Sequence, residues 1–158
     1  MKRGSTAILK GVVILIGLVV LAICIFGLPR LIMSEMATGA DFDYGPIFLG
    51  LYITAIPFFY ALYQALRLLS FIDKNQAFSN DSVRAFKYIK YCAFIISGLF
   101  TLGMPYVFYV ADRDDAPGVV AVGLIVIGAS FVIGIFSAVM LKLVQNALDI
   151  KSENDLTV

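Results

Sequence analysis

The chain has 158 residues, of which 61% are hydrophobic and only 15% are charged, and its formal net charge is +1. A soluble domain usually carries about 25% charged residues, so this composition excludes an ordinary soluble domain and predicts a membrane protein. The sequence has no His, which excludes Ser-His triads, His-ligated zinc and His-ligated haem.

Four long charge-free stretches predict the fold. A helix rises about 1.5 Å per residue and needs about 20 residues to cross a hydrocarbon layer of roughly 30 Å. Only a helix satisfies its own backbone groups over such a length in lipid. We therefore predict an all-α membrane protein, a single domain over residues 1–158 with four transmembrane helices in an antiparallel bundle. The predicted spans are 11–29, 45–66, 91–111 and 118–141, and residues 67–90 form a hinge between the second and third spans.

The distribution of basic residues predicts the orientation. Ten of the 12 Lys and Arg residues lie in the two terminal segments and the hinge, and only Arg30 and Arg113 lie in the other connections. Those connections are acidic instead, with Glu35, Asp41, Asp43, Asp112, Asp114 and Asp115. Short segments rich in Lys and Arg stay in the cytoplasm, so both termini and the hinge are predicted to be cytoplasmic.

The first span follows a short basic head, as a signal peptide would. Its apolar run is longer than a typical signal core, and only the weak small-residue sequence at 37–40 follows it, so we expect the span to be retained. Cys24 lies toward the outer end of this span, whereas Cys92 begins the third span at its inner end. A disulfide needs Cα atoms within about 7 Å, so these two thiols are not expected to be joined.

An aromatic stripe distinguishes the second span. Five aromatic residues fall within an arc of about 100° on the helix, and the four that could wall a cavity are Phe48, Tyr52, Phe59 and Tyr63. Such a cavity would suit a flat or lipid-like ligand. Alternatively, the aromatic residues anchor the helix at the membrane interfaces and pack against neighbouring helices. Pro57 predicts a kink in the same helix.

The hinge contains its own helix start. Ser79 is the predicted N-cap of a helix that begins at Asn80 and continues into the third span. One side of this helix carries Arg84, Lys87 and Lys90. This basic side could contact anionic lipid headgroups or a cytoplasmic protein, or it could serve only to orient the protein.

Small residues recur in the fourth span. Ser130, Gly134 and Ala138 are four residues apart, which predicts a seam where another helix approaches closely. The seam could lie within the bundle or between two copies, so a homodimer is left open. Gly123 lies off this pattern. After the span, residues 151–158 are polar and are expected to be frayed.

The region around the hinge resembles a known family. The second span ends in LRLLSFIDKNQAFS, and the third is preceded by SVRAFKYIKY. Together with the charged N-terminus and acidic first loop, these segments resemble the small four-span bacterial membrane proteins of domain-of-unknown-function family 2975. The likeness covers nearly the whole chain and implies a multi-pass protein of the bacterial cytoplasmic membrane. Members are often encoded beside a small helix-turn-helix regulator, so the resemblance also implies a transcription factor as partner.

The sequence contains no grouping of nucleophile, base and stabiliser, and no ionisable residue lies deep in a predicted span. We therefore predict a non-enzymatic protein of the lipid bilayer without a metal, a cofactor or direct contact with nucleic acid. The main hypothesis is a regulatory or signalling subunit that acts through the basic hinge. Two alternatives are the handling of small molecules or peptides, as in self-protection or accessory transport, and a structural role in a membrane complex.

Overall fold

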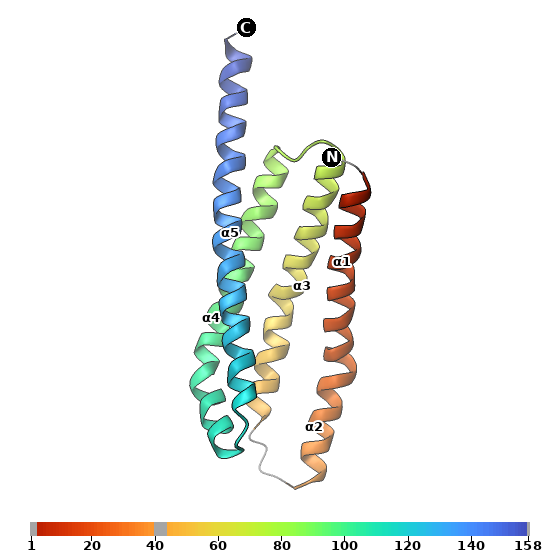
Figure 1. The fold of residues 1–158 in the computed structure, drawn as a ribbon, viewed down its shortest axis with the longest axis vertical. Coiled ribbons are helices and arrows are strands. Elements are labelled where there is room, and N and C mark those ends of the chain that lie inside the picture. The colour runs from red at the N-terminus through yellow and green to blue at the C-terminus, as the bar shows by residue number, and fades with distance from the viewer. Residues whose placement is uncertain (1–2, 40–43, 158) are drawn as a thin grey trace.

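The computed structural model describes residues 3–39 and 44–157, and its regular elements are helices (Figure 1). The first span consists of α1 (Arg3–Ala22), a π-helical turn η1 (Ile23–Gly27) and α2 (Leu28–Ala37), and the others are α3 (Gly45–Asp73), α4 (Asn80–Arg113) and α5 (Pro117–Leu156). Four helices are long and apolar enough to cross a membrane, which confirms the predicted all-α fold. Lys2, Asp41 and Asp43, which entered the charge pattern, lie outside the described residues.

The helices lie side by side in chain order. α1 packs on α3, α3 on α4 and α4 on α5, and no other pair of these four shares an extended interface within the described residues. Neighbours run antiparallel, so the first turn of α1, residues 74–79 and the end of α5 lie toward one end (Figure 1). We call it the hinge end and the opposite end the loop end. The result is an open layer whose large apolar side chains remain exposed on helix after helix, as suits contact with lipid.

α1 contacts α3 through one narrow stripe. Every residue from Ala7 to Phe26 outside this stripe is exposed. A Cβ atom added to Gly17 would lie 3.0 Å from Leu62 Cδ2, so the two backbones approach closely there. At the hinge end, Lys10 Nζ donates to the Asp73 carboxylate. The stripe follows the heptad spacing of helices that pack along their length, and its members are Thr6, Lys10, Val13, Gly17, Val20 and Cys24.

The π-helical turn in the first span is explained by Pro29. The Leu28 amide donates to the carbonyl of Ile23, five residues back. The next π-helical bond would run from residue 29 to the Cys24 carbonyl, but proline has no N–H. The Tyr52 hydroxyl of α3 donates to the Cys24 carbonyl instead, at 2.9 Å. A carbonyl that lacks a donor in its own helix is therefore satisfied from the neighbouring helix.

Gly134, the central residue of the predicted small-residue seam, lies in the α4–α5 interface. A Cβ atom added to the buried Gly134 would lie 3.0 Å from two ring carbons of Phe94. Ser130 and Ala138 flank it and are half-buried. The expectation for Gly123 was wrong, because Gly123 is also buried in this interface and its added Cβ would lie 3.1 Å from Met104. The interface alternates steps of three and four residues, whereas the sequence reasoning followed steps of four alone.

The polar ends of α4 and α5 are more ordered than expected. Ser79 is the N-cap of α4, as predicted, since its Oγ accepts from the Ser82 amide at 3.3 Å. Only residues 74–79 of the hinge lie between helices. The expected fraying of residues 151–158 was wrong, because α5 is helical as far as Leu156. No Gly or Pro follows Lys142, so the helix continues from turns that are already formed.

Candidate functional site

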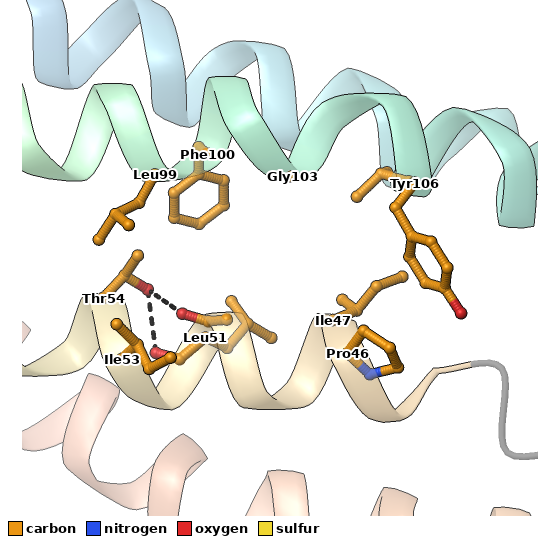
Figure 2. A pocket seen from close by; sticks show the side chains of 11 residues that line it. Pro46, Ile47, Leu51, Ile53, Thr54, Leu99, Phe100, Gly103 and Tyr106 are labelled. Atoms are coloured by element: carbon orange, nitrogen blue, oxygen red, sulfur yellow. Dashed lines mark hydrogen bonds between the residues drawn. The ribbon is translucent and has the colours of Figure 1, made fainter.

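A cavity of about 180 Å³ lies between α3 and α4 toward the loop end (Figure 2). Its walls are residues 46–54 of α3 and 99–107 of α4, and nearly all of the lining side chains are apolar. Thr54 and Tyr106 carry the hydroxyl groups of the lining, and the Thr54 hydroxyl lies 3.0 Å and 2.9 Å from the carbonyls of Gly50 and Leu51 and donates within its own helix. In this loop-end cavity the Thr54 proton is therefore already donated, and the hydroxyl can offer a ligand only an acceptor oxygen.

Two glycines keep the loop-end cavity open. Gly50 lies on the α3 wall and Gly103 on the α4 wall, and a Cβ atom added at either position would meet nothing within 4 Å. They differ in this respect from Gly17, Gly123 and Gly134, where neighbouring side chains fill the space. The absence of side chains at Gly50 and Gly103 leaves space instead of bringing the helices together.

A second, wider cavity of about 510 Å³ continues from the first toward the hinge end. The two cavities share Ile53 and Leu99, so together they form one lateral groove between α3 and α4. The hinge-end cavity contains three tyrosines, Tyr60, Tyr88 and Tyr91. The rings of Tyr60 and Tyr88 meet edge to face with centroids 5.8 Å apart. The groove is thus aliphatic in its middle and aromatic toward the hinge end.

Both walls of the groove continue to an exposed arginine. Arg67 follows Tyr60 by seven residues on α3, and Arg84 precedes Tyr91 by seven residues on α4. Residues seven apart differ by only about 20° around a helix, so each arginine shares the face of its tyrosine. Each lies about 10 Å beyond that tyrosine toward the hinge end. The Arg67 guanidinium lies over the Phe71 ring at 5.4 Å from the centroid, and both arginines are exposed.

Beyond the groove, α4 and α5 form a second feature, the hinge-end extension, which comprises residues 80–90 and 142–156. Ser82 and Ala85 are only 0% and 1% exposed, the lowest values among the buried residues. The Ser82 hydroxyl donates to the Gln76 carbonyl at 3.1 Å and ties the connection to α4. α5 continues past the start of α4 (Figure 1). Its 40 residues span about 60 Å, twice the hydrocarbon thickness.

The three predicted basic contact residues occupy different environments. Arg84 and Lys87 are exposed on the extension, whereas Lys90 is half-buried. The Lys90 Nζ atom lies 4.7 Å from the centroid of the Tyr91 ring, a cation–π contact within the helix. Arg84 and Lys87 are therefore the members of the trio whose side chains are exposed.

The predicted aromatic wall on α3 lies apart from the groove. Phe48 is buried near Tyr44, Tyr52 donates to Cys24 of η1, and Phe59 packs edge to face on Phe58 with centroids 5.6 Å apart. Tyr63 is 58% exposed. None of these four residues lines either cavity of the lateral groove. Tyr52 thus contacts the first span, whereas the ring contacts of Phe48 and Phe59 are with other residues near or within α3.

No prominent side chain in the sequence marks the groove, so it was not among the predicted sites. The groove depends on Gly50 and Gly103 lying opposite each other on antiparallel helices, and this register was not known from the sequence. One pattern in the sequence could have indicated the groove. The groove face of α3 repeats every seven residues and ends in a charge, with Ile53, Tyr60 and Arg67 in succession.

Comparisons with known proteins agree with the resemblance described above. A family model with the description "Protein of unknown function (DUF2975)" matches residues 32–158. A protein of Bacillus subtilis (strain 168) named "Uncharacterized membrane protein YoaS" is 52% identical over 160 residues, which cover 100% of both chains. No solved structure matches the chain. The matched residues include both walls of the groove and the whole extension.

Proposed function

We propose that this chain, which belongs to the DUF2975 family, is a membrane-bound regulatory subunit that binds a cytoplasmic protein through its hinge-end extension. The chain is a membrane protein, and its bacterial relative makes the cytoplasmic membrane the proposed location. The observation that carries the proposal is the packing of the extension. Its residues Ser82 and Ala85 are the most buried in the described chain, although they lie beyond the third predicted span.

A preformed extension suits binding because little order remains to be gained when a partner docks. The N-cap at Ser79 and the hydroxyl bond of Ser82 fix the first turn of α4. Arg84 and Lys87 are then presented from a rigid helix. Their charges suit a partner with an acidic surface, because complementary charge steers association and fixes its register.

The test is the double reversal Arg84→Glu and Lys87→Glu. The tagged protein would be purified from bacterial membranes after mild crosslinking, and co-purified soluble proteins would be quantified by mass spectrometry. We expect the double reversal to abolish recovery of the partner and salt to weaken recovery by the wild type, since exposed charges are screened within about 10 Å at 0.1 M salt.

The matched control reverses Lys2 and Lys74, which belong to the same predicted cytoplasmic side but lie outside the hinge-end extension. This pair changes the total charge equally and should leave recovery unchanged. Reporter fusions after Asp41 and after Asn75 should report opposite sides of the membrane in every variant. Equal recovery with both double variants, with insertion confirmed in this way, would refute docking through Arg84 and Lys87.

A second candidate function, the handling of an apolar small molecule or peptide, is favoured by the lateral groove. The gene neighbourhood separates the two candidates. A regulator gene beside this one would support the docking function, whereas a gene for an ATP-driven exporter or a toxin would support the handling function.

A further inference from the structure

The lateral groove has the chemistry of a site for hydrocarbon. Its aliphatic middle contains Ile53 and Leu99, and its Thr54 hydroxyl is satisfied by the carbonyls of Gly50 and Leu51. The aliphatic middle offers a polar ligand few hydrogen bonds in exchange for those it loses to water, because the proton of the Thr54 hydroxyl is already donated within α3. An alkyl chain loses no such bonds.

The length of the groove fits one membrane leaflet. From Arg67 to Ile53 there are 14 residues along α3, which correspond to about 21 Å. One leaflet contributes about half of the roughly 30 Å hydrocarbon layer, and the polar headgroup region adds several ångströms. A chain that begins at the level of Arg67 would therefore reach the shared residues Ile53 and Leu99, where the hinge-end cavity meets the loop-end cavity.

Charge at one end of the groove identifies the polar part of the ligand. Arg67 and Arg84 lie at the same end of antiparallel neighbours, each seven residues from a groove tyrosine and therefore near its face of the helix, and both are exposed. The stacking of Arg67 on Phe71 directs its guanidinium toward the hinge end, away from the apolar middle. Arginine binds phosphate through two parallel N–H donors, so a pair of arginines at headgroup level favours a phosphate group.

We propose that the lateral groove binds one anionic phospholipid of the leaflet at the hinge end, with an acyl chain between α3 and α4 and its phosphate on Arg67 and Arg84. Tyr60, Tyr88 and Tyr91 lie between the two parts of the lipid, at the level where amphipathic aromatic rings are favoured. The site shares Arg84 and Tyr88 with the hinge-end extension, but Arg67, Tyr60 and the rest of the α3 wall lie outside it, so variants at Arg67 test the lipid site separately from the docking function.

Native mass spectrometry of the purified protein tests the site. The protein would be reconstituted in nanodiscs of phosphatidylcholine mixed with phosphatidylglycerol and then released, and retained lipids would be counted. The wild type should retain one phosphatidylglycerol in preference to phosphatidylcholine. Arg67→Gln should reduce that preference about fivefold, since one basic residue at an anionic surface contributes about 1 kcal/mol. Arg67→Lys should restore most of it, and Lys142→Gln at the same end should leave it unchanged.

The apolar part is tested by filling the groove. Gly103→Leu places a side chain in the loop-end cavity, where an added Cβ meets nothing within 4 Å. Gly98→Leu is the matched control, because Gly98 is on the same helix with the same free space but does not line the groove. We expect Gly103→Leu to shift the retained lipid toward shorter acyl chains and Gly98→Leu to have no such effect.

Three results would overturn the site. The first is equal retention of phosphatidylglycerol and phosphatidylcholine by the wild type, the second is an unchanged preference in Arg67→Gln, and the third is a co-purified peptide in the groove in place of lipid. Recovery of the cytoplasmic partner by Arg67→Gln is measured in parallel. Loss of lipid preference with normal partner recovery would support the lipid site alone, whereas partner loss in Arg84→Glu/Lys87→Glu with a normal Arg67→Gln phenotype would support the docking function alone.

Discussion

Replacement of Tyr52 by Phe should weaken the contact between the first span and α3 by removing one hydroxyl. That hydroxyl donates to the Cys24 carbonyl at 2.9 Å, and the amide that would otherwise reach this carbonyl in the π-helical turn belongs to Pro29. Tyr52 lies about 10 Å along α3 from Gly45, below the predicted interface, so water is a poor substitute. The change leaves the aromatic ring in place, so the effect reports the hydrogen bond.

The expected loss is about 1.5 kcal/mol. Hydrogen bonds between membrane helices contribute about 0.6 kcal/mol on average and up to about 1.7 kcal/mol, because the unfolded state in the membrane usually finds other partners. The Cys24 carbonyl has lost its alternative donor, and an acceptor that faces lipid without a partner costs about 1–3 kcal/mol, as a buried one does. The expected loss therefore lies in the upper part of the range for hydrogen bonds between membrane helices. The measurement is equilibrium unfolding in mixed micelles of a non-ionic detergent and dodecyl sulfate.

A double-mutant cycle with Pro29→Ala makes the prediction specific. Alanine supplies an N–H that can bond to the Cys24 carbonyl, so Tyr52→Phe should cost at least about 1 kcal/mol less in that background, beyond the roughly 0.5 kcal/mol scatter of additive pairs. Tyr60→Phe is the matched control, since no hydrogen bond of the Tyr60 hydroxyl is found within the described residues. An equal cost of Tyr52→Phe in both backgrounds would refute the explanation of η1.

Two further predictions concern the other interfaces. Gly134→Leu should destabilise the protein by about 1–3 kcal/mol in the same assay, because the new side chain meets the Phe94 ring. The control Gly128→Leu should cost little, because nothing lies within 4 Å of its added Cβ. Equal stability of the two variants would contradict close packing at Gly134. Asp73→Asn should lower the free energy of unfolding by about 1 kcal/mol, because it weakens the partly exposed ion pair with Lys10. The charge exchange Lys10→Asp with Asp73→Lys should recover part of that loss. If it recovers none, the effect belongs to Asp73 alone and not to the ion pair.

The sequence predicted the features of the fold that one helix determines by itself. Charge-free length predicted four helices long and apolar enough to cross a membrane, and the Ser79 hydroxyl located the start of α4. Features that depend on two helices were predicted less well. The seam at Gly134 was found, but Gly123 was excluded because the spacing of an interface depends on how its helices cross. The π-helical turn combines a local cause, Pro29, with a distant one, Tyr52.

The candidate site was harder to predict than the fold, because more of it depends on how two helices lie against each other. The exposed charges Arg84 and Lys87 could be found from helix periodicity, since they stand out in an apolar sequence. The lateral groove could not, because it consists of space opposite Gly50 and Gly103 and requires the relative height of two helices. The aromatic stripe indicated a distinctive face of α3 correctly but gave no indication of what that face contacts.

The open layer has a consequence for the synthesis of the protein. Each span packs on the span that precedes it in the chain, so every interface can form as soon as its later member leaves the ribosome. A closed ring of helices would have to wait for the last span to meet the first. Loops that join neighbouring helices are short, and the entropy lost in closing them is correspondingly small. Assembly can therefore proceed in the order of translation, and α5 completes the protein by covering α4 alone.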